Sequence, residues 1–180
     1  AFLQTLYGAN QNTNNGNTEF KFNIDDRSQN WETIWDASGV DTIIFNGEQN
    51  YSVNIDLRAP TLNLTDPEQT LSGICTVTDP NTWGGFAIGH NVNIENARSG
   101  NGNDTLTGND LNNVLNSLGG NNIFNPNLGD NLIKSGNGND TIYLKSAELW
   151  DNKFVAVHTI TNETSTYESI NLQGYNKFSD

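Results

Sequence analysis

Several residue types are scarce in this chain of 180 residues, and each scarcity excludes a class of structure or partner. A single cysteine, Cys75, rules out an internal disulfide, and its apolar neighbours predict an inert, buried thiol. No run of 18 apolar residues occurs, so we expect no membrane span. Only 8 Lys and Arg stand against 21 Asp and Glu. The net charge of −13 argues against nucleic acid, since phosphate binding needs clustered cations, and favours a chain that gathers cations.

Turn-forming residues take the place of the usual apolar content. The chain has 32 Asn and 17 Gly, whereas hydrophobic residues make up only 34%. Asn and Gly both tolerate positive φ and favour turns, so this composition predicts many turns and short strands, with little helix. The 4 Trp residues, with the Phe and Ile around them, supply enough core material to argue against a disordered chain.

Residues 99–143, here called the repeat array, divide into blocks of nine: SGNGNDTLT, GNDLNNVLN, SLGGNNIFN, PNLGDNLIK and SGNGNDTIY. The eighth place is always apolar, and its residues are Leu106, Leu115, Phe124, Ile133 and Ile142. The sixth place changes between Asp and Asn, and its residues are Asp104, Asn113, Asn122, Asn131 and Asp140. A nine-residue period with one buried place per block is typical of a parallel β-helix or β-roll. The sequence therefore predicts an all-β fold, a right-handed parallel β-roll flanked by antiparallel strands.

Two blocks per turn would stack the first, third and fifth blocks, with about 4.8 Å between strands. Asp104, Asn122 and Asp140 would then form one column, and Asn113 and Asn131 the other. Stacked carboxylates repel one another unless a cation lies between them. Replacing Asp by Asn removes the repulsion and allows an amide ladder of the kind seen in stacked sheets.

Glycines near the second and fourth places let each turn adopt positive φ and direct carbonyl oxygens to one side. Ca²⁺ prefers six to eight such oxygens, at about 2.3–2.6 Å. We therefore predict Ca²⁺ as the cofactor. The roll residues predicted to hold it are Gly100, Gly102, Asp104, Gly120, Asn122, Gly136, Gly138 and Asp140.

Four regions follow from the pattern along the chain. Residues 1–28 are interpreted as the remnant of an upstream domain and a linker, and residues 29–98 as a β-strand region that braces the roll. Residues 99–143 are the roll, and residues 144–180 are a C-terminal β cap. The chain opens on AFLQTLYGAN, without Met or a basic segment, which we interpret as a fragment or a processed product.

Three segments resemble the C-terminal calcium-binding β-roll (RTX repeat) domain of the serralysins, a family of secreted zinc metallopeptidases. TIWDASGVDTIIFNG at 33–47 is similar to the family's WDAGGNDT-type stretch. AIGHNVNIENARSGNGND at 87–104 is similar to its strand leading into the roll, and LYGAN at 6–10 to the end of its protease domain. The resemblance covers about residues 1–145, and the last 35 residues match poorly.

The resemblance implies a calcium site outside the roll. Its ligands would be Asn14, Gly16, Thr18, Asp36, Ser38, Gly39, Asp41, Asn93 and Glu95. Ser38 stands where the family has Gly, and Asn14 where it often has Arg, but both would act through main-chain carbonyls. Asp36, Asp41 and Glu95 are hard oxygen donors, so we expect calcium to be held more securely here than in the roll. The alternative is that Asp36 and Asp41 only initiate turns.

Catalytic zinc chemistry is not expected in this chain, which has no H-E-x-x-H motif and only 2 His. His90 and His158 are assigned structural roles. The resemblance implies a non-enzymatic module that folds and stabilises on binding calcium, in a secreted, extracellular protein. It also implies an upstream zinc metalloendopeptidase domain and type I secretion machinery as partners.

Other functions remain open on this sequence. A polysaccharide lyase or epimerase would need clustered cations, yet Arg58, Arg98 and Lys134 look isolated. An ice-binding or adhesion face would need a Thr ladder, which the seventh place interrupts at its second, third and fourth blocks. A stand-alone extracellular module could instead bind carbohydrate or protein through the loop 59–85, where Trp83 is either a stacking residue or part of the core.

Overall fold

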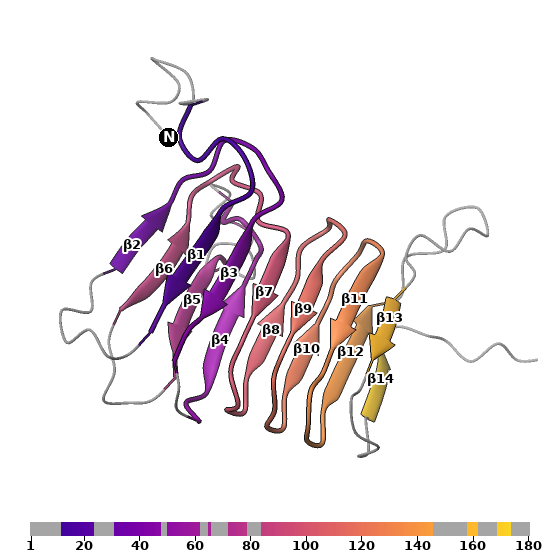
Figure 1. Ribbon diagram of the computed structural model, residues 1–180. Helices are drawn as coiled ribbons and strands as arrows, with labels where there is room; N and C mark the ends of the chain where they lie inside the picture. Colours follow the sequence, from indigo (N-terminus) through magenta and orange to yellow (C-terminus); the bar gives the residue numbers. More distant parts are fainter. Residues whose placement is uncertain are drawn as a thin grey trace, which may run out of the picture.

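The computed structural model describes residues 12–23, 31–47, 50–61, 65, 72–78, 84–145, 158–161 and 169–173. Within these ranges the chain forms strands and no helix, arranged as a six-stranded and an eight-stranded sheet (Figure 1). The all-β prediction is confirmed. In spatial order the six-stranded sheet contains β1 (Glu19–Phe22), β3 (Thr42–Phe45), β7 (Asn96–Arg98), β9 (Val114–Asn116), β11 (Asn131–Lys134) and β13 (His158–Thr161). The eight-stranded sheet contains β14 (Ser169–Gln173), β12 (Thr141–Lys145), β10 (Ile123–Asn125), β8 (Thr105–Thr107), β4 (Val53–Asp56), β5 (Ile74–Val77), β6 (Gly85–Ile88) and β2 (Trp31–Ile34).

Consecutive strands of the repeat array lie in opposite sheets, and strands 18 residues apart pair in parallel. In the eight-stranded sheet, Leu106 is in register with Phe124, and Phe124 with Ile142. In the six-stranded sheet, Leu115 is in register with Ile133. The chain therefore changes sheet at every block and returns after two blocks, as the stacking of alternate blocks predicts.

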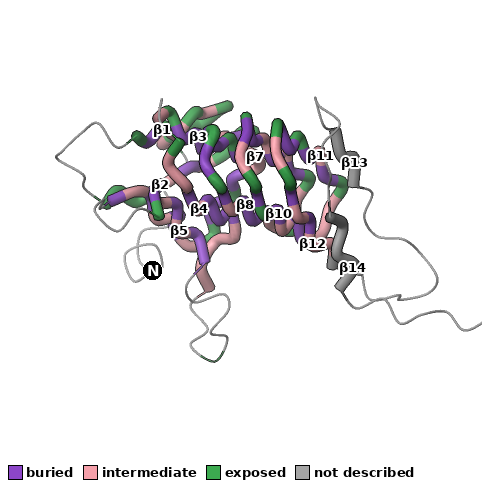
Figure 2. Tube along the Cα trace, turned by 90° about the horizontal axis from the view of Figure 1, so that it is seen from below, coloured by how far each residue is buried: buried purple, intermediate pink, exposed green. Residues whose placement is uncertain are grey.

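The core lies between the two sheets, where Figure 2 shows the buried positions facing one another. All of the eighth-place residues of the repeat array are 0% exposed. The buried columns continue beyond the array through Ile55 on β4 and through Ile43 and Ala97 on β3 and β7. One apolar place per block is sufficient to fill this core, because successive side chains of a strand point to opposite faces of its sheet and only the eighth-place side chain of each short strand points inward.

The expectation of antiparallel flanking strands is wrong for nearly all of them. β1, β3 and β7 stack in parallel before the array, and β13 and β14 pair in parallel with β11 and β12 after it. Within the described residues, only β5 runs antiparallel, to both β4 and β6. Strands that alternate between sheets return in the same direction, whereas β4, β5 and β6 follow one another within one sheet and must reverse.

Two strands lie where the sequence predicted none. β1 falls inside residues 1–28, which were assigned to an upstream remnant and linker, and β5 falls inside the loop 59–85. Each has four residues, which is too few to establish an alternating pattern. Residues 1–11 and Trp83 lie outside the described residues.

Neighbouring residues of β10 provide a test of the core. Phe124 is 0% exposed and Ile123 is 40% exposed. Phe124→Ala should lower the free energy of unfolding by about 3–5 kcal/mol, because it removes a ring and leaves a cavity. Ile123→Ala should change it by less than about 1 kcal/mol. Urea unfolding of the two variants measures the difference, and equal losses would contradict the assigned inward and outward faces.

Candidate functional site

The sixth-place residues of the odd turns (residues 99–104, 117–122 and 135–140) form a ladder of side-chain to main-chain hydrogen bonds. Oδ1 of Asp104 accepts the Val53 N–H at 3.0 Å. Oδ1 of Asn122 accepts the Asp104 N–H at 2.9 Å, and Oδ1 of Asp140 accepts the Asn122 N–H at 2.8 Å. The predicted column is present. The predicted amide-to-amide ladder is wrong, because the stacking brings the N–H of the preceding turn within reach of each Oδ1.

Asp104 and Asn122 differ in what their second side-chain atom can do. Nδ2 of Asn122 donates to the carbonyl oxygen of Gly120 at 3.1 Å and to those of Gly119 and Ser135 at 3.3 Å. Oδ2 of Asp104 is buried and has no hydrogen-bond partner among the described residues. Burial raises the pKa of Asp104 to about 6, despite the hydrogen-bond donors around it.

Glycines let the odd turns stack closely enough for carbonyl oxygens to face this column. A Cβ at Gly120 would lie 1.9 Å from the carbonyl oxygen of Gly102, and one at Gly138 would lie 2.0 Å from that of Gly120. By the 18-residue equivalence with Asn122, we expect carbonyl oxygens of the stacked turns near Oδ2 of Asp104, together with the Ser99 side chain and the Gly100 main chain. A bound cation satisfies such a set, and carboxylate with carbonyl oxygens is the donor chemistry that fits calcium.

The remaining predicted glycines of the roll also lie between stacked turns. The carbonyl oxygen of Gly100 accepts the N–H groups of Leu118 at 3.1 Å and Gly119 at 3.3 Å. Gly136 has a φ of +76°, and a Cβ there would lie 2.6 Å from the carbonyl oxygen of Leu118. The structure thus brings all of the predicted roll residues into one stack of turns. Their binding of calcium remains a prediction.

The second predicted calcium site combines two turns that the pairing of β1 with β3 brings together. The Thr18 N–H donates to Oδ1 of Asp41 at 2.8 Å, and the Gly16 N–H donates to the Ser38 carbonyl at 2.7 Å. A Cβ at Gly39 would lie 2.5 Å from the carbonyl oxygen of Gly16. These five residues, which the resemblance groups together, therefore share one small region.

Two of the three expected carboxylates interact with each other, and the third contacts the main chain of Asp41. Oδ2 of Asp36 is buried without a hydrogen-bond partner among the described residues. Burial, followed by the charge of Asp41, raises the pKa of Asp36 to about 6. Oε2 of Glu95 accepts the main-chain N–H of Asp41 at 2.8 Å, which brings the third carboxylate to the same turn. Across the described residues, no group of three or more His, Cys, Asp and Glu side chains is already arranged around a common point, and the convergence of these three carboxylates on calcium remains a prediction.

Asn14 and Asn93 complete the predicted set. Nδ2 of Asn14 donates to the Trp35 carbonyl at 2.8 Å, which ties its turn to the residue preceding Asp36. Asn93 is exposed, two residues before Glu95. The assignment of either residue as a calcium ligand remains a prediction.

A second ladder, in the fifth place of the odd turns, was missed from the sequence. Oδ1 of Asn103 accepts the Asn121 N–H at 2.8 Å, and Oδ1 of Asn121 accepts the Asn139 N–H at 2.8 Å. These bonds run in the opposite direction to those of the sixth place, so each turn is tied to its neighbour both ways. The sequence did contain a signal for this ladder, because every fifth-place residue is Asn or Asp. These residues are Asn103, Asn112, Asn121, Asp130 and Asn139.

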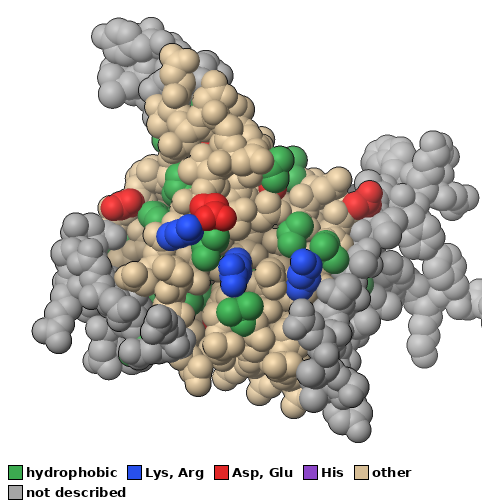
Figure 3. Space-filling view, viewed as in Figure 1, with side chains coloured by type: hydrophobic (Ala, Val, Ile, Leu, Met, Phe, Trp, Pro, Cys, Tyr) green, Lys and Arg blue, Asp and Glu red, His purple; other side chains and the backbone are tan. Residues whose placement is uncertain are grey.

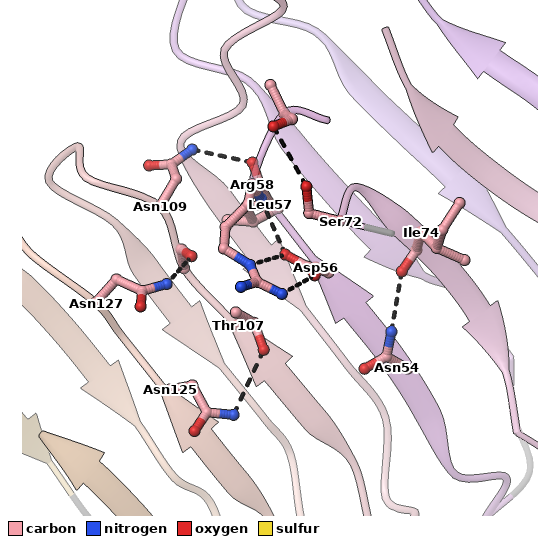
Figure 4. Close-up of polar contacts among 12 residues, drawn as sticks. Asn54, Asp56, Leu57, Arg58, Ser72, Ile74, Thr107, Asn109, Asn125 and Asn127 are labelled. Carbon is pink, nitrogen blue, oxygen red and sulfur yellow. Dashed lines mark hydrogen bonds and ion pairs between the residues drawn. The ribbon is translucent and has the colours of Figure 1, made fainter. Parts of the chain in front are cut away.

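The even turns (residues 108–113 and 126–131) carry Asn at the second place, where the repeat pattern expects Gly. Nδ2 of Asn109 donates to the carbonyl oxygens of Ile94 at 2.8 Å and Leu57 at 3.2 Å. Nδ2 of Asn127 donates to the Gly108 carbonyl. Figure 4 shows the bonds to Leu57 and Gly108 beside the Asp56–Arg58 ion pair. These side chains bridge successive turns, which loss of glycine alone did not predict.

Three of the cations form a row, although the sequence suggested that Arg98 and Lys134 are isolated. Strand register aligns Lys21 with Ile44, Ile44 with Arg98, and Arg98 with Lys134 through Asn116. Lys21, Arg98 and Lys134 are exposed, and Lys and Arg side chains lie spaced across this face in Figure 3. Two strand spacings separate successive cations, or about 9–10 Å. Glu19 forms an ion pair with Lys21 at 2.6 Å.

The remaining candidate residues have structural contacts or lie outside the description. Nδ1 of His90 lies 2.8 Å from the Pro60 carbonyl oxygen, which agrees with a structural role. Cys75 is 0% exposed, and burial raises the pKa of its thiol to about 12, as expected of an inert residue. His158 belongs to β13, whose side chains are not described. Among the described residues, no helix is long and apolar enough to cross a membrane.

Comparison with known proteins identifies the family. Residues 3–180 match the family described as "Peptidase M10 serralysin C terminal", so the match extends through the last 35 residues, which had been expected to match poorly. The Metalloprotease AprA of Pseudomonas entomophila is 36% identical over 126 residues, which cover 64% of this chain and 23% of that protein. Serralysin B of Dickeya chrysanthemi is 34% identical over 59% of this chain and 21% of its own length. Serralysin of Proteus mirabilis is 33% identical over 63% and 22%. The chain spans less than a quarter of the length of these relatives, and it belongs to the serralysin C-terminal family of the M10 peptidases.

Proposed function

We propose that this chain is a calcium-binding folding and stabilising module of a secreted, serralysin-like metallopeptidase. Its two sheets would form a right-handed parallel β-roll of the RTX type. In this proposal the catalytic zinc belongs to an upstream peptidase domain, and the chain itself performs no catalysis. Family membership supports the assignment of this chain to a larger metallopeptidase, since the matched relatives bear the names of metalloproteases and serralysins.

One observation carries the calcium proposal. Oδ2 of Asp104 is buried and makes no hydrogen bond to the described residues, at a position whose equivalent in the next odd turn is an amide group that contacts three carbonyl oxygens. A buried carboxylate oxygen that faces carbonyl oxygens is destabilising unless a cation lies among them. Asp36, buried beside Asp41, presents the same problem in the other candidate site.

Calcium would make the stability of the folded chain depend on whether the chain is inside or outside the cell. In a cytosol of low calcium, uncompensated carboxylates at both sites lower the stability of the folded chain. Outside the cell, where calcium is abundant, binding to the folded state alone stabilises it by linkage. A chain of this kind passes through a type I secretion channel loosely folded and becomes stable after export.

The row of Lys21, Arg98 and Lys134 favours a second candidate function, the binding of an extended anionic polymer such as an acidic polysaccharide. The cations recur on alternate strands of a flat sheet face, in a chain that is otherwise strongly acidic. This is the stand-alone binding or adhesion module that the sequence left open, and it is compatible with a calcium-stabilised fold.

The first prediction separates the two calcium sites by removing charge while keeping the Oδ1 acceptors. Asp41→Asn and Asp104→Asn should each bind fewer calcium ions than the unaltered chain in calorimetric titration. Asp41→Asn should cause the larger loss of affinity, because Asp36 and Asp41 lie together. The proposal is wrong if the unaltered chain binds no calcium, and the ranking is wrong if the two losses are equal.

The second prediction concerns pH in excess chelator. The pKa of Asp104 is raised to about 6 in the folded chain, above its usual value, so the folded state binds more protons than the unfolded state. Stability should therefore rise as pH falls from about 7 to about 4, by about 1 kcal/mol after allowance for solvent screening. Asp104→Asn should lack this component. Denaturant unfolding of both chains across this range measures it, and parallel pH profiles would contradict it.

The third prediction tests the cation row. An Arg98→Glu/Lys134→Glu variant should lose retention on an immobilised acidic polysaccharide at low salt, and salt should elute the unaltered chain. Lys145→Glu, on a strand of the other sheet, is the control for a change of net charge. Equal retention of all three proteins would remove this candidate function.

A further inference from the structure

The amide groups of the repeat array occupy the positions where its turns would otherwise need cations. We propose that Asn122 replaces calcium in the central odd turn, and that Asn109, Asn113, Asn127 and Asn131 replace it throughout the even turns. Calcium would then bind the array only at odd turns that carry Asp. This inference rests on the proposed function, which it deepens by stating which turns bind the ion.

Asn122 shows the substitution most directly, because it stands between two Asp-bearing turns. Its Oδ1 accepts the N–H of Asp104 in the preceding odd turn, as Oδ1 of Asp140 accepts that of Asn122. Oδ1 of Asp104 accepts the N–H of Val53 on β4 in the same way. Its Nδ2 donates to two carbonyl oxygens of its own turn and to the Ser135 carbonyl of the next odd turn. An NH₂ group thus joins carbonyl oxygens of two stacked turns, which is the bridging role of a cation in this geometry.

The even turns repeat the arrangement with other partners. Oδ1 of Asn131 accepts the Asn113 N–H at 2.7 Å. Nδ2 of Asn131 donates to the carbonyl oxygens of Leu128 at 2.8 Å, Gly129 at 3.1 Å and Pro126 at 3.3 Å. The sixth-place amide is again surrounded by the carbonyl oxygens of its own turn.

Asn113 lacks most of these carbonyl contacts, and Asn109 supplies a substitute. Nδ2 of Asn113 donates to the Glu95 carbonyl at 3.0 Å and to Oδ1 of Asn109 at 2.9 Å. Nδ2 of Asn109 in turn reaches the carbonyl oxygens of Leu57 and Ile94, and Asn127 bridges to the Gly108 carbonyl. Neither even turn has a carboxylate at its second or sixth place. Amide donors therefore occupy the acceptors around these two places, and the carboxylates of the even turns, Asp110 and Asp130, lie exposed at the third and fifth places instead.

Converting one amide to a carboxylate should create a calcium site. Asn131→Asp keeps Oδ1 and replaces the donating Nδ2 by an oxygen, so this oxygen and the carbonyl oxygens of Pro126, Leu128 and Gly129 would face one another without a donor between them. Native mass spectrometry should show more bound calcium than in the unaltered chain. In excess chelator the melting temperature of the variant should fall, and calcium should restore it. Asn112→Asp, one turn away and exposed, adds the same charge and should change neither quantity.

Hydrogen exchange of the unaltered chain in chelator provides a test that does not depend on the variant's folding. The Asp104 and Asn113 main-chain amides, which are bonded to Asn122 and Asn131, should remain protected at least about tenfold more than the Val53 and Asn122 amides. The latter two are bonded to the carboxylates of Asp104 and Asp140. Equal protection overturns the inference, as does an Asn131→Asp chain that binds no additional ion or keeps its melting temperature in chelator. Absence of calcium from the unaltered chain would instead overturn the proposed function, while protected central amides would still support the amide replacement.

Discussion

The stack of turns depends on one hydrogen bond that recurs every 18 residues. The Oδ1 atom of a sixth-place residue accepts the main-chain N–H of the sixth-place residue one turn earlier, as between Asn122 and Asp104. Such a bond contributes about 1 kcal/mol, but its main effect is geometric. It fixes the parallel register, which in turn aligns the buried residues Leu106, Phe124 and Ile142 in one column.

Asp and Asn are interchangeable in that bond, and their difference lies entirely in the second atom. Nδ2 of Asn is a donor and satisfies nearby carbonyl oxygens within the protein. Oδ2 of Asp is an acceptor and, when buried, needs a cation or a proton, as the raised pKa of Asp104 indicates. Under the proposed function, one substitution would change a self-sufficient turn into a calcium-dependent one while keeping the Oδ1 hydrogen bond. The repeat can therefore combine both kinds of turn in one fold.

The same stacking explains why the flanking strands do not form a separate bracing layer. β1, β3 and β7 continue the six-stranded sheet of the array, and the turn of Asp36 and Asp41 leads into β3 as the even turns lead into β9 and β11. The turn of Asp104 leads instead into β8 of the other sheet. A calcium ion at either place would stabilise one continuous core. Coupling of the two sites through that core is a consequence of the topology, since no domain boundary separates their strands.

The nine-residue pattern by itself determined the all-β fold, the buried eighth place and the column of Asp104, Asn122 and Asp140, because a period of nine survives in the sequence as a local signal. Only the tertiary structure decided the direction of the flanking strands, the row of Lys21 and Arg98, and the partners of each side-chain nitrogen. The strand directions and the row of cations depend on residues that are far apart in the sequence and become neighbours only when the strands pair. The side-chain nitrogens bond both within their own turn, as Asn131 does to Leu128, and to a stacked turn, as Asn122 does to Ser135. The sequence shows where an Asn stands but not which groups its side-chain oxygen and nitrogen contact, because these contacts form only when the turns fold and stack.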